Sequence, residues 1–382
     1  MSELKSQIDK LPGILLSARP DQIDVQRFSA MAKEGQIDLT TIATLLRYHE
    51  QVLDELVEEA TSTNLERYRR EIEFYAVCYI SDFCVNSCRY CGLQNRMKQS
   101  RTQLDHEGLK MEFEAVLHRG PTDLCILTGE HPCVTTDYLA LAANIATEAD
   151  VHKALDHITF NVAPMKVEDF KRLKKAVRFP TLQYRIFQES YDPETYSEMH
   201  PSGPKTDYEF RLDAQERALQ ADIDRVGIGT LLGLNSRNEP YKHFGNDFEI
   251  LALVTHARHL RKIFGRDPYS LSIPRHQPFP GHDFSTPNPV GDKRYLAYHA
   301  LLRLALPNTK IVLTNRETEE LRNKFRPLIN IEDLAARPEV GGNSRNDTGL
   351  IQNEVNDSRG VEEIVEDLKT RGFFPILGQK RR

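Results

Sequence analysis

The sequence predicts an α/β fold, a (β/α)8 TIM-type barrel that is closed or nearly closed and carries an N-terminal helical extension. From Glu73 onward, short β-branched or apolar runs alternate with amphipathic helical stretches. Strands separated by helices form parallel units with right-handed crossovers. Seven or eight such units in this sequence favour a barrel over an open sheet.

The elements follow in order along the chain. The residues before the first strand are expected to be helical, because Ile37–Arg47 and Leu53–Arg70 carry apolar side chains three and four positions apart. The strand candidates are Phe74–Ser81, Leu124–Thr128, His157–Asn161, Gln183–Gln188, Arg225–Leu232, Tyr269–Ile273, Lys310–Leu313 and a weaker one near Leu328–Ile331. We expect a helical extension over residues 1–70 and the barrel, with a C-terminal extension, over residues 71–382. The length is equally compatible with two domains.

Composition limits the class of function. Hydrophobic residues make up 40% and charged residues 28% of the chain, and the net charge is −6, so we expect no nucleic acid partner. No apolar run is long enough to cross a membrane and the charged segment Met1–Lys10 lacks a signal-peptide core, which predicts no membrane partner and a cytoplasmic location. All six cysteines lie at or before Cys133, which favours reduced thiols that bind a metal over a disulfide framework.

Three of these cysteines form the most informative motif. Cys84, Cys88 and Cys91 follow the first predicted strand with the spacing C-x3-C-x2-C. Thiolates at these spacings can hold one [4Fe–4S] cluster, whose fourth iron then has no protein ligand and stays open to a cofactor or substrate. The alternatives are a zinc site or three unrelated core cysteines. Zinc sites usually present paired Cys-x2-Cys units, and only one such unit occurs here.

With the aromatic Tyr90 inside it, this motif resembles the hallmark of the radical S-adenosylmethionine (SAM) superfamily. There the open iron binds SAM, and one electron cleaves SAM to a 5′-deoxyadenosyl radical. Gly129 and Glu130 resemble the pair that receives the methionine amino group, and Gly229 and Leu231 belong to a segment that resembles the strand along adenine. The resemblance implies further cofactor contacts at Tyr90, Asn161, Gln188, Glu189 and Arg211. The implied cofactors are one [4Fe–4S] cluster and SAM.

A closer resemblance is to the aromatic amino acid lyases, which include the tyrosine lyases of thiamine synthesis and hydrogenase maturation and the tryptophan lyases of thiopeptide synthesis. It rests on Tyr79–Gly92, Phe187–Asp192, Gly203–Lys205 and Arg211–Gly233. It implies that the radical takes hydrogen from the amino group of a free aromatic amino acid, with tyrosine favoured over tryptophan, and that the substrate fragments at Cα. The alternatives are a radical SAM synthase or mutase for a different amino-acid-like substrate, and an iron–sulfur carrier or redox sensor.

The same resemblance implies a substrate site. Arg316 matches the arginine that grips the substrate carboxylate, a task for which a planar guanidinium fork is suited. The alternative is a surface arginine paired with Glu317 or Glu320. Tyr79 matches a tyrosine near the substrate ring, although a strand residue of this kind could equally belong to the core. Arg275 matches the first arginine of a sixth-strand segment whose second arginine is absent here.

Other departures from the family concern acidic residues and cysteines. Glu332 and Asp333 lie where the tryptophan lyases place a small hydroxyl residue, and an inward acid there would alter substrate choice. Together with Glu130 and His276 they are candidates to influence the protonation of the substrate amine. No cysteine follows Cys133 to bind a second cluster, so carbon monoxide and cyanide production is not expected. The implied partners are a small-molecule amino acid and an electron donor such as flavodoxin or ferredoxin.

Overall fold

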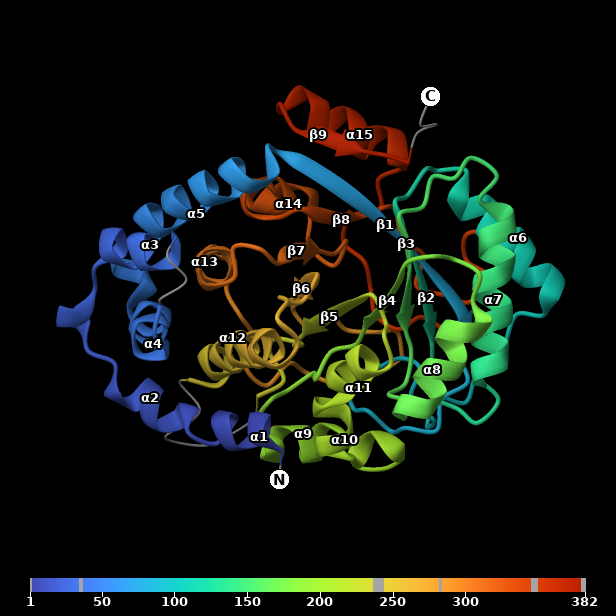
Figure 1. The fold of residues 1–382 in the computed structure, drawn as a ribbon, viewed down its shortest axis with the longest axis horizontal. Helices are drawn as coiled ribbons and strands as arrows, with labels where there is room; N and C mark the ends of the chain where they lie inside the picture. The colour runs from blue at the N-terminus through green and yellow to red at the C-terminus, as the bar shows by residue number, and fades with distance from the viewer. Residues whose placement is uncertain (1, 34–36, 236–243, 282–283, 345–349, 379–382) are drawn as a thin grey trace.

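The computed structural model describes residues 2–33, 37–235, 244–281, 284–344 and 350–378, and its centre is a closed parallel barrel (Figure 1). The strands are β1 Glu71–Ser81, β2 Asp123–Thr128, β3 His157–Asn161, β4 Leu182–Arg185, β5 Arg225–Gly229, β6 Ser270–Ser272, β7 Lys310–Leu313, β8 Ile331–Asp333 and β9 Phe374–Ile376. Each of the first seven strands pairs in parallel with the next, and β8 pairs with β1 to close the barrel. The predicted (β/α)8 barrel is confirmed, and it is closed.

Two features of the sheet differ from the prediction. The eighth strand begins at Ile331 rather than near Leu328, because Arg326–Leu328 form a short 3₁₀ turn that ends helix α14. The ninth strand, β9, was not predicted: it adds to the lower part of β1 outside the barrel, where Glu71 pairs with Phe374. Its three residues are too few to show a period in the sequence.

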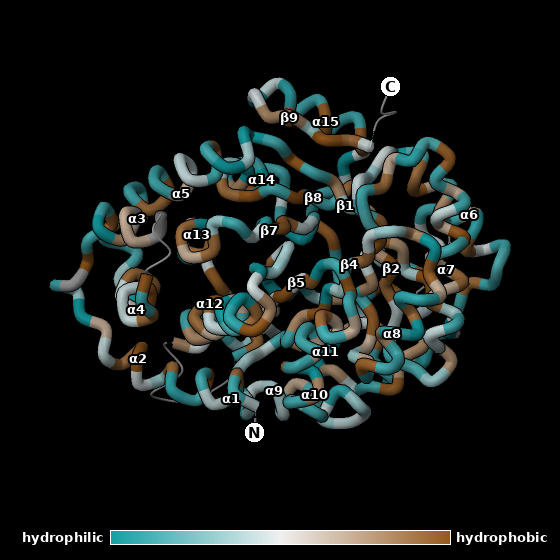
Figure 2. The backbone as a smooth tube through the Cα atoms, in the orientation of Figure 1, coloured by the Kyte–Doolittle hydropathy of each residue, from teal (hydrophilic) through white to brown (hydrophobic). Residues whose placement is uncertain are grey.

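Helices cover the outside of the barrel. Those that follow β1 are α6 His106–Leu117, α7 Thr136–Ala149, α8 Val167–Ala176, α9 Pro193–Met199, α10 Tyr208–Leu212, α11 Ala214–Gln220, α12 Gly245–Phe264, α13 Asp292–Ala305, α14 Glu319–Phe325 and α15 Val361–Thr370. Figure 2 shows hydrophobic backbone concentrated in the strands, and β2 is buried along its whole length. This two-sided burial is the usual state of a parallel strand between a barrel interior and a helical layer. Among the described residues, no helix has both the length and the apolar character that a membrane span requires.

Five helices precede the barrel: α1 Glu3–Ile8, α2 Leu11–Ser17, α3 Val25–Lys33, α4 Leu39–Tyr48 and α5 Leu53–Tyr68. Ser2 and Asp38 cap two of them by accepting a backbone N–H with their side chains. In Figure 1 these helices lie beside α12 and α13, against which α4 and α5 pack. The extension is helical as expected. The boundary at residue 70 as a domain division stays a prediction.

Alternation along β1 and β8 decides which side chains reach the barrel interior. Tyr75, Val77 and Tyr79 line an interior cavity, while the intervening side chains on β1 face the helices. On β8, Asp333 pairs with Tyr75 and lines the same cavity. Glu332, its neighbour, therefore points outward. Successive residues of one strand thus have opposite environments.

Candidate active site

The three cysteines lie on a loop that leaves the carboxyl end of β1. Asn86 anchors this loop, because its Nδ2 donates to the Glu130 carboxylate (2.7 Å) and its Oδ1 accepts the backbone N–H of Lys205 (2.9 Å). Gly203, at φ 97°, lies so close that an added Cβ would stand 2.4 Å from Asn86 Oδ1. Glycine is therefore required at this position both for its backbone conformation and for the close approach.

The loop fits an iron–sulfur cluster. Burial raises the pKa of the Cys88 thiol to about 11 and that of Cys91 to about 12, with the neighbouring cysteine thiols adding to both. Such thiols become thiolates only when a metal takes the place of the proton. Within the described ranges no three His, Cys, Asp or Glu side chains converge to hold a single ion. The loop contains a single Cys-x2-Cys unit together with Cys84, and this motif favours the predicted cluster over the zinc alternative.

Gly129 and Glu130 follow β2 and lie against the cysteine loop. A Cβ on Gly129 would stand 2.3 Å from the Phe83 carbonyl oxygen and 3.0 Å from Cys84 Cβ. The backbone carbonyl of Glu130 accepts the N–H of Val85 (2.8 Å), so the two loops are fastened together. Glu130 does not line the cavity described below, because its carboxylate is turned toward Asn86.

Glu189 is the most constrained of the predicted residues. It is a half-buried non-glycine residue at φ 70°, a conformation that costs free energy and that the surroundings must enforce. Its carboxylate pairs with Lys205 (2.8 Å) and Arg211 (3.4 Å). Burial raises the pKa of Glu189, but the two cations outweigh burial and hold it below its usual range. The amide oxygen of the adjacent Gln188 is buried without a hydrogen-bond partner in the described chain.

Lys205 continues into a chain of polar contacts that passes through Tyr90. Lys205 Nζ donates to Tyr90 Oη (2.9 Å), and Tyr90 Oη is 2.8 Å from His200 Nε2. Burial and the two nearby cations hold the pKa of His200 well below its usual value, so the ring is neutral and Tyr90 is the donor. His200 Nδ1 then donates to the Tyr196 carbonyl (2.7 Å). Neither Lys205 nor His200 was predicted from the sequence.

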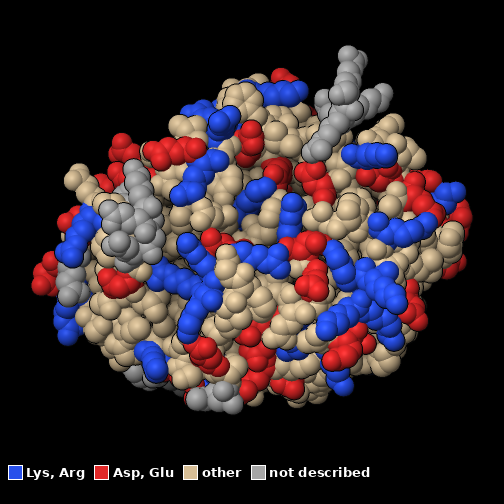
Figure 3. Space-filling model, in the orientation of Figure 1, with Lys and Arg blue, Asp and Glu red and all other residues tan. Residues whose placement is uncertain are grey.

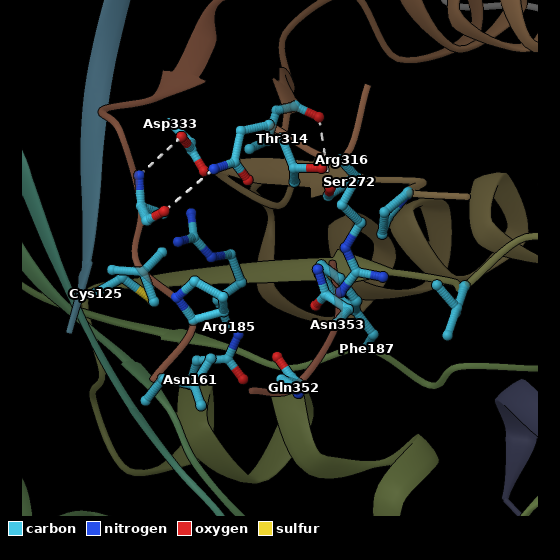
Figure 4. Close-up of a pocket in the computed structure, with 18 of the residues that line it drawn as sticks. Cys125, Asn161, Arg185, Phe187, Ser272, Thr314, Arg316, Asp333, Gln352 and Asn353 are labelled. Carbon is cyan, nitrogen blue, oxygen red and sulfur yellow. Dashed lines mark hydrogen bonds between the residues drawn. The ribbon is translucent and has the colours of Figure 1, made fainter. Parts of the chain in front are cut away.

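The cavity occupies the barrel interior below the cysteine loop (Figure 4). Of the predicted residues it is lined by Tyr79, Tyr90, Cys91, Asn161, Glu189, Arg211, Leu231 and Arg316. Gly129, Glu130, Gln188 and Gly229 stand behind this lining; a Cβ on Gly229 would meet the Phe187 ring at 2.4 Å.

Arg316 and Tyr79 both reach this cavity. The Arg316 guanidinium makes no hydrogen bond or ion pair with any described residue, so it is not paired with Glu317 or Glu320 as the surface alternative required. Glu317 is instead paired with Arg275. Tyr79 donates from Oη to the Gln352 side chain (2.7 Å), and Gln352 also lines the cavity. Gln352 and Asn353 come from the segment after β8, which the sequence did not mark.

Arg275 is placed differently from the prediction. Its guanidinium is occupied by Glu317, by Asp292 (2.8 Å) and by the Val290 carbonyl (2.9 Å), and the arginine is not among the cavity-lining residues. The reason is that α13 and the loop after β7 supply two carboxylates within its reach. In this structure Arg275 ties that loop to α13 rather than facing the cavity.

The structure gives different environments to the four residues that were candidates to influence the protonation of the substrate amine, namely Glu130, described above, and Glu332, His276 and Asp333. Glu332 is fully buried outside the barrel, where it pairs with Arg322 and Arg326. His276 has its pKa lowered to about 4 by burial and by Arg316, and its ring contacts Thr286 (2.8 Å). Asp333 lines the cavity, and burial raises its pKa to about 6.

The comparisons with known proteins agree with this arrangement. The profile of the radical SAM superfamily matches residues 78–245, and that of the biotin and thiamin synthesis associated domain matches residues 272–374. The chain is similar to the 2-iminoacetate synthase of Escherichia coli, with 28% identity over 85% of this chain and 82% of the relative. HydG, the [FeFe]-hydrogenase maturase from Carboxydothermus hydrogenoformans, superposes with a TM-score of 0.85 and 30% identity over 98% of this chain and 84% of that chain.

A methylornithine synthase shares the fold at a TM-score of 0.70, with 18% identity over 92% of this chain and 98% of that one. At this sequence identity the likeness shows the fold alone. The cysteine loop, the glycine cradle against Cys84 and the two matching profiles point the same way as the HydG likeness. The chain therefore belongs to the radical SAM superfamily, in the aromatic amino acid lyase branch, and is a carbon–carbon lyase that uses a [4Fe–4S] cluster and SAM.

Proposed function

We propose that the protein cleaves free L-tyrosine at Cα, after removal of a hydrogen atom from the substrate amino group. When bound, the [4Fe–4S] cluster and SAM together supply the electron and the 5′-deoxyadenosyl radical for that step. The observation that carries the proposal is the unpaired Arg316 guanidinium inside a closed barrel, below the cysteine loop. The curated relatives, which are 2-iminoacetate synthases, support tyrosine as the amino acid.

The cofactor residues keep the roles that the resemblance implies. Cys84, Cys88 and Cys91 would hold the cluster. The SAM contacts that we propose are Tyr90, Gly129, Glu130, Asn161, Gln188, Glu189, Arg211, Gly229 and Leu231. Glu189 is pre-set for such a role, since Lys205 and Arg211 keep it ionised and its backbone is held in one conformation.

The substrate residues act by position and charge. Arg316 would bind the carboxylate with both arms of its fork, because no described side chain competes for it. Tyr79, held by Gln352, would lie along the substrate ring. The cations Arg316 and Arg211 both line the cavity. Cations close to the substrate amine disfavour its ammonium form and so favour the neutral amine required for hydrogen abstraction.

The test is turnover of the anaerobically reconstituted enzyme with a flavodoxin or ferredoxin as electron donor. Tyrosine should stimulate 5′-deoxyadenosine release and yield a cresol-type fragment, whereas tryptophan and phenylalanine should not. Arg316→Lys should lower kcat/KM for tyrosine by about tenfold to a hundredfold, chiefly through KM, since one ammonium cannot replace a bidentate fork. The control is Arg178→Lys, an exposed arginine paired with Glu148. Release of deoxyadenosine without tyrosine fragmentation would support a synthase or mutase instead.

A further inference from the structure

The inner end of the cavity is polar, which is unusual for a pocket that receives an aromatic ring. This end is lined by Tyr75, Arg185 and Asp333, beside Cys125. On β1, Tyr75 lies four residues before Tyr79 and so further from the cysteine loop. In Figure 4, Arg185, Cys125 and Asp333 lie on one side of the cavity and Arg316 on the other. The side chains of Arg185, Tyr75 and Asp333 are 4%, 5% and 2% exposed, so this group is screened from bulk water.

The polar groups at this end are incompletely paired. The Arg185 guanidinium lies over the Tyr75 ring (4.7 Å) and 3.6 Å from the Asp123 carboxylate, which is beyond hydrogen-bond distance. Its buried Nη1 has no hydrogen-bond partner in the described chain. The Tyr75 hydroxyl faces the same cavity, and Asp333 accepts backbone N–H groups from Ala336 (3.3 Å) and Asn315 but no side-chain donor on the cavity side among the described residues. Unpaired buried donors and acceptors destabilise the protein. A ligand group that forms hydrogen bonds with them removes this cost, which makes binding of the ligand more favourable.

Arg316 and the inner polar group lie on one cavity and belong to neighbouring segments of the barrel. The register of β7 with β8 continues to Thr314 beside Asp333, and Arg316 follows in the turn after β7. The cavity lining also includes the apolar side chains of Val77, Leu127, Phe187 and Val312. A tyrosine whose carboxylate is on Arg316 would place its ring against these apolar side chains and bring its phenol to the inner end.

We propose that Arg185, Tyr75 and Asp333 form the subsite that recognises the phenolic hydroxyl of the substrate. The proposal rests on the function proposed above and deepens it. A phenol hydroxyl both donates and accepts hydrogen bonds, so it can accept a hydrogen bond from Arg185 and donate one to Asp333. The Tyr75 hydroxyl can act as donor or acceptor toward the same phenol. An indole N–H only donates and would leave Arg185 unpaired, and a phenyl ring would leave all three groups unpaired. The inner end therefore selects tyrosine against tryptophan and phenylalanine.

The test measures binding of L-tyrosine, L-phenylalanine and L-tryptophan to the unreduced holoenzyme with SAM, where no turnover occurs. A site built to hydrogen-bond a substrate hydroxyl rejects the analogue that lacks it by a large factor, so the wild type should bind phenylalanine at least ~100-fold more weakly than tyrosine. Arg185→Lys should lower the ratio of the Kd for phenylalanine to the Kd for tyrosine about 30-fold, because tyrosine binds more weakly to the variant. The Kd for phenylalanine should change less than about threefold. Tyr75→Phe, which removes one hydroxyl and keeps the ring, should lower the ratio about fivefold.

The matched control is Tyr184→Phe, a buried tyrosine next to Arg185 whose hydroxyl donates to the Val162 carbonyl outside the cavity. It should leave the ratio unchanged. Iron content and circular dichroism establish that each variant is folded. If Arg185→Lys does not fold, the binding ratio of Tyr75→Phe provides the test. If the wild type cleaves tyrosine but binds phenylalanine equally well, or if both variants keep the wild-type ratio, the subsite is refuted while the lyase proposal stands. If the wild type does not cleave tyrosine, the proposed function itself has failed.

Discussion

The buried acid Glu332 provides a sharp test, because the sequence offered it as a substrate residue and the structure makes it a structural one. It accepts from Arg322 Nη2 (2.8 Å) and Arg326 Nε (2.8 Å), and all three side chains are fully buried. Arg322 keeps Asp357 as a partner and Arg326 keeps Asp367. Glu332→Gln removes one negative charge from this cluster and places an amide N–H₂ against guanidinium donors.

The expected loss of stability follows from that count. Removing one partner of a buried ion pair costs about 3–5 kcal/mol, and the remaining carboxylates put this case at the lower end. Globular proteins gain about 2.1 cal/mol/K of unfolding entropy per residue, or about 0.8 kcal/mol/K for a chain of 382 residues. A loss of about 3 kcal/mol therefore lowers Tm by about 4 °C.

Differential scanning calorimetry of the reconstituted enzyme measures this change. Glu320→Gln is the control: Glu320 lies on α14, the helix that carries Arg322, is 80% exposed and pairs with Lys324 at the surface, so the Tm of this variant should not change. Turnover per bound cluster should stay at the wild-type value in Glu332→Gln. An unchanged Tm together with reduced turnover would show that Glu332 serves the reaction and that our placement of it is wrong.

Two further predictions concern the cofactor loops. Gly129→Ala would place a Cβ 2.3 Å from the Phe83 carbonyl oxygen, so it should displace the cysteine loop and lower the iron content after reconstitution, measured by iron and sulfide analysis; full iron content would contradict the packing. Glu249, on α12, accepts from Ser190 Oγ and the Tyr191 N–H behind Glu189, and burial raises its pKa from 4.5 to about 7. Its stabilising contribution is therefore complete below about pH 4.5 and is lost as the pH rises through about 7, a loss of roughly 3 kcal/mol. Relative to Glu249→Gln, the wild-type Tm should fall by about 4 °C between pH 5 and pH 8, and parallel pH profiles would refute this assignment.

Electrostatics at the surface agree with the composition. Figure 3 shows acidic and basic side chains interspersed over most of the face in view, with basic side chains gathered at its right. Ion pairs such as Arg178 with Glu148 and Arg89 with Glu198 are part of this mixed surface. A mixed surface of this kind does not favour attraction of a polyanion.

The prediction of the barrel depended on local pattern alone. All eight barrel strands begin within three residues of the expected positions, because each is an apolar run bounded by helices and such runs can be recognised from the sequence alone. The cysteine loop was predictable for the same reason, since Cys84, Cys88 and Cys91 lie within one short segment. The strand β9 and the contribution of Gln352 were not, because they pair with residues on β1 that are far away in the chain.

The sequence by itself therefore determined the fold class and the cluster motif, which rest on strand periodicity and on neighbouring residues, and its motifs carry the resemblance that indicated the reaction branch. Only the tertiary structure decided which partners the individual charged side chains have and whether they line the cavity. Glu332 and Asp333 are adjacent, yet one pairs with Arg322 and Arg326 outside the barrel and the other lines the cavity. Arg275 pairs with two carboxylates, whereas Arg316 pairs with none in the part of the chain that the structure describes. Which partner a charge meets depends on strand register and barrel closure, which bring together residues that the sequence keeps apart.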